Sequence, residues 1–216
     1  RIYTAKKQAV EEVLQRGRIP LLVDPDGRSI EVLKPDVVVD AIIAKKNLGT
    51  YKEMAPLVIG IGPGFVAGKD VHLVVESMRG HNLARILETG SALANTGIPG
   101  NIGGYTKERV IHAAAEGYMK NLHQIGDVVR KGEKIARIYE QMSPEGVFSG
   151  RFVSVEATIP GVLRGLIREG YHFQKGFKIA DIDPRESELA NCFTISDKAS
   201  SIGGSVLEAV CRYVNG

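Results

Sequence analysis

The sequence contains no tryptophan, and only 6% of its 216 residues are aromatic. Proteins that bind nucleic acids by base stacking need aromatic platforms, so this scarcity argues against such a function. The formal net charge of +3 is also too small and too dispersed to indicate a basic surface that binds nucleic acid. We therefore expect no nucleic-acid partner.

Long apolar runs are missing as well, since no stretch approaches the roughly 20 apolar residues that a membrane-spanning helix needs. The chain begins at Arg1 without the layout of a signal peptide. Two cysteines are too few for the disulfide framework of a small secreted domain. With 44% hydrophobic and 25% charged residues, the sequence predicts a cytoplasmic globular protein without a membrane partner.

The most informative pattern that is present is an internal repeat. Gly126–Ile138 recurs about 44 residues later as Gly170–Ile182, with the common form G-x-x-(V/F)-x-K-G-x-x-I-A-x-I. The match extends backwards to three further pairs: Ala113 with Ala157, Gly117 with Gly161, and Leu122 with Leu166. Two short strand units punctuated by glycine predict two similar halves that bury each other's apolar faces. The pattern is typical of a biotinyl- or lipoyl-like barrel-sandwich hybrid.

In a biotin or lipoate carrier of this type, the hairpin between the halves presents a lysine. The joining segment Tyr139–Phe152 has none, and no lysine occurs between Lys134 and Lys175. A covalent carrier is therefore disfavoured. A docking or scaffolding module is the simpler interpretation.

The rest of the chain suggests an α/β layer. Residues 4–16 have the spacing of a helix. A second helix is expected from about residue 200 onward, with Cys211 in the core. Four apolar runs predict strands at 20–24, 37–43, 56–61 and 71–76. We predict an α/β fold with a partial Rossmann-like parallel layer and an inserted all-β barrel-sandwich hybrid. The expected domains are 1–110 (α/β, without its Rossmann start), 111–183 (barrel) and 184–216 (a strand and a helix that pack back).

Four glycines surround the end of the apolar strand 56–61, and they are Gly60, Gly62, Gly64 and Gly68. Such a turn can expose consecutive backbone N–H groups that bind an anion. It is not a phosphate loop of the GxxxxGK[ST] kind, because Asp70 follows Gly68-Lys69. The alternative is an ordinary glycine-rich hairpin.

Arg79, His81 and Arg85 follow shortly, and the first two would point the same way on an extended segment. Arginine forms a planar fork that suits phosphate or carboxylate groups. Together with Asn95 and Thr96 of the following loop, these residues complete a predicted cofactor-binding set. A solvated, salt-bridged loop is the alternative.

Further candidates are less developed. Asp70, His72 and Glu76 alternate on one strand, but without a second histidine or a cysteine at ligand spacing we predict no metal site. Asp24, Asp40 and Lys45–Asn47 follow apolar strands and are second-rank ligand candidates.

Cys192 begins a possible strand, Cys192–Ile195, near Arg185, which could activate the thiol. Cys192 is therefore the candidate catalytic residue, and a half-buried structural cysteine is the alternative.

Taken together, several unusual motifs resemble the YqeB family, proteins of the selenium-dependent molybdenum hydroxylase system. The resemblance covers nearly the whole chain and rests on six segments: Lys45–Gly49, Gly60–Val71, Glu76–Leu83, Asn95–Gly100, Gly161–Ile167 and Cys192–Lys198. Members of the family carry a glycine-rich, Rossmann-like start that this sequence lacks.

The resemblance implies an accessory protein that matures molybdenum hydroxylases needing a labile selenium atom. Its expected partner is a hydroxylase apoenzyme, and its expected ligand is the phosphate-bearing molybdenum cofactor or a selenium species carried on Cys192. An enzyme that transfers selenium to the cofactor, and a biotin- or lipoate-type carrier or docking module, remain alternatives. The sequence does not decide whether the protein turns over a substrate, nor its oligomeric state.

Overall fold

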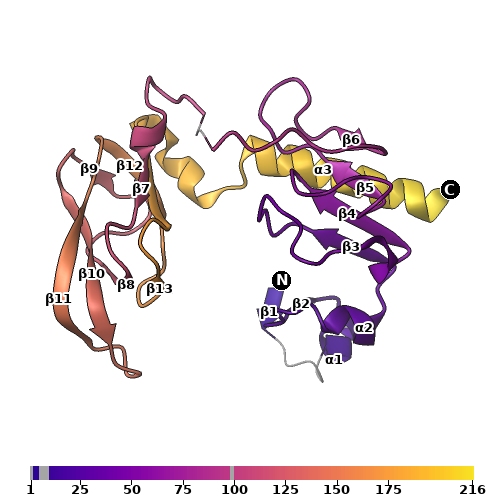
Figure 1. Cartoon of the computed structure of the whole chain (residues 1–216), viewed down its shortest axis with the longest axis horizontal. Coiled ribbons are helices and arrows are strands. Elements are labelled where there is room, and N and C mark those ends of the chain that lie inside the picture. Colours follow the sequence, from indigo (N-terminus) through magenta and orange to yellow (C-terminus); the bar gives the residue numbers. More distant parts are fainter. Residues whose placement is uncertain (1, 5–9, 98–99) are drawn as a thin grey trace. The chain divides into compact units, whose positions relative to one another are not determined.

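The computed structural model describes residues 2–4, 10–97 and 100–216, with the backbone alone for 2–4. The chain divides into two units: unit 1 comprises Arg1–Asn95 and Asp197–Gly216, and unit 2 comprises Thr96–Ser196. Unit 1 therefore consists of two separate stretches of sequence, and unit 2 lies between them in the chain (Figure 1).

Unit 1 is built on one four-stranded sheet of order β3-β4-β5-β6, in which the first three strands are parallel and β6 is antiparallel. Two short strands, β1 and β2, pair separately. The strands are β1 (Ile2–Thr4), β2 (Ile19–Leu21), β3 (Val37–Asp40), β4 (Leu57–Ile61), β5 (Leu73–Val75) and β6 (Ile86–Leu87). The helices are α1 (Val10–Gln15), α2 (Ser29–Leu33), the 3-10 turn η2 (Lys52–Met54) and α3 (Asp197–Asn215).

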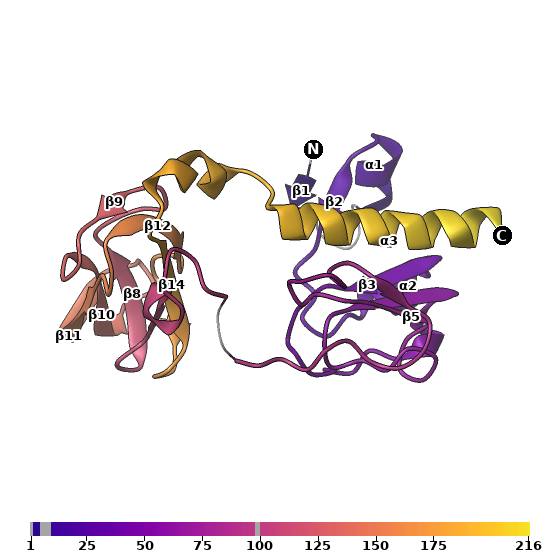
Figure 2. The ribbon, with the colours of Figure 1, turned by 90° about the horizontal axis from the view of Figure 1, so that it is seen from above.

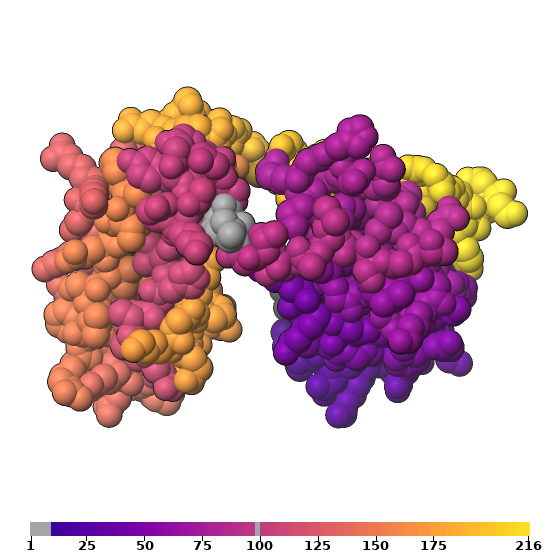
Figure 3. All heavy atoms as spheres, turned by 45° about the horizontal axis from the view of Figure 1, so that its top comes forward, coloured from indigo at the N-terminus to yellow at the C-terminus, as the bar shows by residue number. Residues whose placement is uncertain are grey.

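Alternation along β4 explains how both faces of this sheet are buried. Leu57, Ile59 and Ile61 face α3, whose Ile202, Val206, Ala209 and Val210 recur at helical spacing and pack on them. Figures 2 and 3 show α3, in yellow, against the rest of unit 1. The opposite face packs on the loop after β4, and its buried members are Val58, Phe65, Ala67, Val71, Val74 and Ala92.

Unit 2 consists of two four-stranded antiparallel sheets that enclose one apolar core. The sheet orders are β11-β10-β8-β13 and β7-β14-β12-β9. The strands are β7 (Val110–His112), β8 (Gly117–Asn121), β9 (Val128–Val129), β10 (Lys134–Met142), β11 (Phe148–Glu156), β12 (Gly161–Leu166), β13 (His172–Phe173) and β14 (Lys178–Asp183). The 3-10 helices η3 (Lys107–Arg109) and η4 (Glu186–Phe193) flank them.

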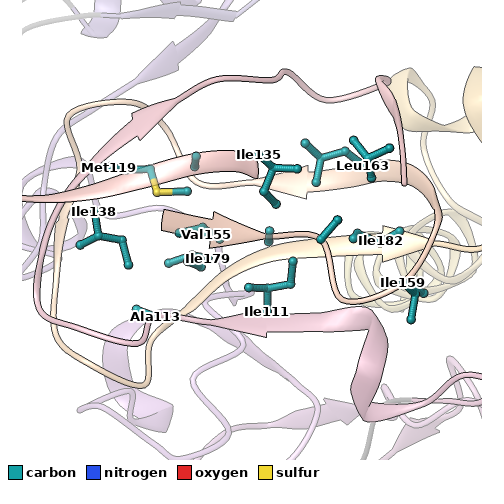
Figure 4. Packing of buried hydrophobic residues seen from close by; sticks show 14 of the residues in the cluster. Ile111, Ala113, Met119, Ile135, Ile138, Val155, Ile159, Leu163, Ile179 and Ile182 are labelled. Atoms are coloured by element: carbon teal, nitrogen blue, oxygen red, sulfur yellow. The ribbon is translucent and has the colours of Figure 1, made fainter. Parts of the chain in front are cut away.

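The core of unit 2 lies between the sheets, as Figure 4 shows. Its largest fully buried side chains come from both copies of the repeat, and they are Met119, Ile135, Ile138, Leu163, Ile179 and Ile182. Ile135 and Ile138 of the first copy correspond to Ile179 and Ile182 of the second. The apolar positions of the repeat are therefore the positions that join the two sheets.

Equivalent backbone hydrogen bonds run in both directions between the two copies of the repeat. The N–H of Gly126 donates to the carbonyl of Leu163 at 2.9 Å, and the N–H of Gly170 donates to that of Met119 at 2.8 Å. Likewise, Gly132 donates to Ala157. In the second copy, the N–H of Gly176 donates to the carbonyl of Ala113. Both of these hydrogen bonds are 2.8 Å long. Each copy thus satisfies the backbone of the other.

The predicted fold class, an α/β fold with a partial Rossmann-like layer and an inserted barrel-sandwich hybrid, is wrong. Two of the three four-stranded sheets are antiparallel throughout, and helices are few. In the described chain no α-helix connects β3 to β4 or β4 to β5, whereas parallel layers of the Rossmann type need a helix in each crossover. The apolar runs predicted the strands of the parallel layer, but the connections between them are loops.

Several boundaries also differ from the prediction. The strand expected over 37–43 ends at Asp40, because Ile43 has a positive φ of 58° and the backbone turns. The helix expected over 4–16 is described only as α1, and residues 5–9 lie outside the described residues. Cys192 lies in η4 instead of a strand. Cys211, expected in the core, is exposed on α3.

The repeat predicts which glycines are irreplaceable. Gly117 (φ 152°) and Gly161 (φ 146°) occupy equivalent positions, and a Cβ on either would overlap the carbonyl oxygen of the neighbouring strand, at Tyr139 and Asp183 respectively. We expect Gly117→Ala and Gly161→Ala each to lower the free energy of unfolding of unit 2 by more than about 3 kcal/mol, through strain and overpacking.

Gly132→Ala is the matched control, because Gly132 also has a positive φ (84°) but nothing within 4 Å of its Cβ position. Its expected cost is about 1 kcal/mol from backbone strain alone. Urea unfolding of the full chain measures all three variants. Equal costs would contradict the close-approach explanation.

A buried ionic cluster predicts acid sensitivity. Asp183 is 1% exposed and accepts hydrogen bonds from the guanidinium groups of Arg185 (2.8 and 3.0 Å) and Arg164 (2.9 Å). Mainly through the Arg185 hydrogen bonds, the pKa of Asp183 falls from 3.8 to about 2. The ionised carboxylate therefore stabilises the folded state above its unfolded-state pKa, and this contribution is lost as the pH falls from about 4 through 2.

The shift corresponds to about 2 kcal/mol. We expect Asp183→Asn to remove that part of the acid dependence, measured as urea midpoints between pH 5 and pH 2. Asp26→Asn, at an exposed carboxylate of unit 1, serves as the control and should leave the profile unchanged. An unaltered profile in Asp183→Asn would assign the acid sensitivity to other groups.

Candidate functional site

The carboxyl ends of β3, β4 and β5 lie side by side in unit 1, because the three strands are parallel and adjacent. Asp40 is in register with Gly60, and Ile61 with Val75. The loops that leave these three strands therefore begin at one edge of the sheet. In open parallel sheets, this is the edge at which ligands bind. We call it the carboxyl edge.

Glycine allows two of these loops to touch. Gly64 has a φ of 114°, and a Cβ there would lie 2.7 Å from the Cα of Lys46. Gly62, with a φ of 79°, lies so close to Ser77 that a Cβ would overlap its hydroxyl group. The loop after β4 is therefore packed directly against the segments that follow β3 and β5.

The same loop carries consecutive backbone donors. The N–H of Gly62 donates to Val75 O and that of Val66 to the Asp70 carboxylate. The N–H groups of Gly64 and Phe65, in contrast, receive no acceptor from the described part of the chain. Two adjacent free N–H groups beside a positive-φ glycine form the kind of concave donor pair that binds an anion.

Lys45 and Lys46 stand exposed next to this donor pair. Their loop is fixed by Asn47, whose side-chain oxygen accepts the N–H groups of Gly49 and Thr50, both at 2.8 Å. Lys45 itself has a φ of 62°. Sequence reasoning ranked these lysines second, although the Asn47 turn motif beside them was a usable signal.

Two buried carboxylates hold the edge together. Glu76, 3% exposed, accepts the N–H of Met78 at 2.6 Å and that of Leu93 at 2.7 Å. Asp40, 7% exposed, accepts the N–H of Ile42 at 3.1 Å and the Thr50 hydroxyl at 2.5 Å. Because these carboxylates bind backbone groups of the loops, they are structural elements of the edge.

The predicted cationic cluster is only partly assembled. Arg79 donates two hydrogen bonds to Asp197, at 2.8 and 2.9 Å, which raises the Arg79 pKa and ties the loop after β5 to the start of α3. The segment expected to be extended is turned instead, with Gly80 at φ 136°. His81 and Arg85 are exposed beyond this turn.

The other predicted residues lie elsewhere. Gly68 approaches Lys52, which precedes β4, so it lies at the amino end of that strand and away from the carboxyl edge. Asn95 is the last residue of the first stretch of unit 1, and Thr96 begins unit 2. Both are exposed.

Cys192 belongs to unit 2, where it is half-buried in η4. Arg185, expected to activate it, binds the carboxylate of Asp183 and lies 3.6 Å from that of Glu188. The guanidinium group is therefore held by two carboxylates.

The alternating polar residues Asp70, His72 and Glu76 flank β5, and each accepts a hydrogen bond from a backbone N–H group. The His72 Nδ1 atom accepts the N–H of Val58 at 3.0 Å, and Asp70 accepts that of Val66 at 2.9 Å. Burial lowers the pKa of His72. Within residues 2–4, 10–97 and 100–216, no group of three or more His, Cys, Asp or Glu side chains is placed to hold a metal ion.

A scan against protein-family models finds no match. A curated relative, the "uncharacterized protein YqeB" of Escherichia coli (strain K12), is 46% identical over 215 residues, which covers 100% of this chain. The chain belongs to the YqeB family. It spans 37% of the length of that relative.

Two solved structures of other proteins resemble part of this chain weakly. The ectoine utilization protein EutE (DoeB) of Ruegeria pomeroyi is 16% identical, with a TM-score of 0.28 over 46% of this chain and 28% of that one. An aspartoacylase family protein of Mesorhizobium loti is 11% identical, with a TM-score of 0.32 over 47% and 29%. At such scores, no conclusion on fold or activity follows.

Among the described helices, none is both long and apolar enough to cross a bilayer.

The geometry of the carboxyl edge predicts the effect of a small substitution. Gly64→Ala should cost more than about 2 kcal/mol of folding free energy in unit 1, because strain at φ 114° adds to a clash with the Lys46 backbone. Gly90→Ala, with a φ of 77° and open space around it, should cost about 1 kcal/mol. Urea unfolding compares the two variants, and indistinguishable costs would mean that the loops do not touch in solution.

Proposed function

We propose that this protein is an accessory factor in the maturation of selenium-dependent molybdenum hydroxylases, and that its carboxyl edge holds the phosphate-bearing end of the molybdenum cofactor. Two observations support the proposal. Membership of the YqeB family extends over the whole chain, and its motifs suggested this pathway. The carboxyl edge carries the residues that an anionic ligand needs.

The observation that carries the proposal is the contact between Gly64 and the backbone of Lys46. It brings two free backbone N–H groups next to two exposed lysines. A phosphate group would take hydrogen bonds from Gly64 and Phe65 and charge neutralisation from Lys45 and Lys46. When bound, the molybdenum cofactor would supply the metal-binding dithiolene of its pterin. The protein would supply the orientation and the neutralising charge.

Arg79 was predicted to bind the anionic ligand, but in this proposal it has a positioning role. Its guanidinium group is engaged by Asp197, so it positions the loop after β5. Selenium carriage on Cys192 stays a separate prediction. It would fail if Cys192→Ser supported full hydroxylase activity in cells.

The first test measures binding of inorganic pyrophosphate to the purified chain by calorimetry, because pyrophosphate offers the phosphate chemistry without the pterin. We expect the double variant Lys45→Gln/Lys46→Gln to weaken binding by tenfold or more. Lys69→Gln is the matched control, since Lys69 is exposed in the same unit but is next to Gly68. Equal affinity in the double variant would overturn the assignment of the carboxyl edge.

The second test concerns maturation itself. In cells that make a selenium-dependent hydroxylase, loss of the gene should lower hydroxylase activity while the hydroxylase polypeptide is retained. The parent gene should restore activity, and the Lys45→Gln/Lys46→Gln variant should not. Full activity without the gene would reject the pathway, whatever the pyrophosphate result.

A further inference from the structure

The internal repeat makes the two sheets of unit 2 equivalent, yet their outer faces differ. On the β14–β12–β9 side, Val162 and Asp183 point away from the core, and they are 0% and 1% exposed. They are covered because η4 packs on β12 and Arg185 binds Asp183. The equivalent positions on the other sheet, Tyr118 and Tyr139, are only partly covered. One outer face thus has a cover within the chain, whereas its counterpart is open.

The open face carries a row of rings that crosses all four strands. His172 is paired with Tyr118, Tyr118 with Tyr139, and Tyr139 with Phe152. Directly paired residues share a face, and the alternate residues Met119, Ile138 and Phe173 form the core. The four rings therefore point outward. We call this row, together with Phe148, the aromatic face.

The rings form two contacting groups, one of Tyr118 and His172 and one of Tyr139, Phe148 and Phe152. The ring centroids of Tyr118 and His172 are 4.6 Å apart, those of Tyr139 and Phe152 are 5.1 Å apart, and Phe148 lies 5.5 Å from Tyr139. Phe152 is 47% exposed. Five rings on one face of a regular sheet, each of them exposed or half-buried, are more than the scattered apolar residues of an ordinary surface.

Charges of both signs lie beside the rings, Lys120 and Arg137 against Glu116 and Glu169. Lys120 pairs with Glu169 at 3.0 Å, and the Glu116 carboxylate lies 3.5 Å from Nε2 of His172. Arg137 stacks on Phe152 with its guanidinium carbon 4.7 Å from the ring centroid, and its Nε has no hydrogen-bond partner in the described chain.

An apolar centre rich in Tyr, Phe and Arg with a polar rim is the composition of a protein–protein interface. Because the rim charges nearly cancel, the face suits neither a polyanion nor a strongly acidic segment. A surface of balanced charge can face a rotated copy of itself, and two-fold contacts of this kind are the commonest in soluble oligomers. We propose that the aromatic face pairs two copies of this chain about a two-fold axis, sheet against sheet.

Sedimentation equilibrium of the full chain over a wide concentration range tests the proposal. The parent protein should form dimers, and Phe152→Glu should raise the dimer Kd at least 100-fold. Phe193→Glu is the matched control, because Phe193 is also an exposed ring of unit 2 (71%) but belongs to η4. This control should dimerise like the parent.

Hydrogen exchange of the parent protein keeps the test independent of how variants fold. Amides of β10 and β11 should become more protected as the protein concentration rises. A chain that stays monomeric, or a dimer that Phe152→Glu leaves intact, would overturn the proposal. So would a monomer that binds a thymidine oligonucleotide through Phe152, since that would assign the face to single-stranded nucleic acid.

Discussion

Unit 2 depends on the close approach of backbones at Gly117 and Gly161. Each glycine lies where the carbonyl of a neighbouring strand, at Tyr139 or Asp183, leaves no room for a side chain. These approaches let the strands of the two repeat copies interlock, so that turns of one copy donate hydrogen bonds to the other. Neither copy can satisfy its backbone or bury its isoleucines alone. Folding of the unit is consequently a joint event of both halves.

In unit 1, the main constraint is on the three loops that leave β3, β4 and β5 at the carboxyl edge of the sheet. The buried carboxylate of Asp40 binds the backbone of the loop after β3, and that of Glu76 binds the loop after β5 and Leu93. A buried carboxylate is costly unless it accepts hydrogen bonds, so each one enforces the loop geometry that satisfies it. The loop after β4 is held by its own backbone, because the N–H of Gly62 donates to Val75 O and that of Val66 to the Asp70 carboxylate.

The sequence predicted those parts of the fold in which local pattern and packing agree. The continuous apolar run at Leu57–Ile61 is a strand buried on both faces, and Ile202, Val206 and Val210 recur at helical spacing on α3. The Rossmann-like layer was wrong because apolar runs identify strands but do not show whether helices connect them.

The candidate site was predictable to a similar extent. Gly62 and Gly64 were identified because a glycine-rich turn after an apolar strand has a local meaning. The contact of Gly64 with Lys46, and the engagement of Arg79 by Asp197, join residues far apart in sequence. No periodicity reports such contacts. For the same reason, the buried Asp183 cluster was not expected, since only tertiary packing places Arg164 and Arg185 on one carboxylate.

The discontinuity of unit 1 has a consequence for the newborn protein. The helix α3, which covers one face of the β3–β6 sheet, is translated after all of unit 2. Until α3 has been synthesised, Leu57, Ile59 and Ile61 have no helix to pack against. Unit 2 can complete its core before unit 1, although it follows the first stretch of unit 1 in the sequence. Between these two units, the usual N-terminal-first order of domain folding during synthesis would then be reversed.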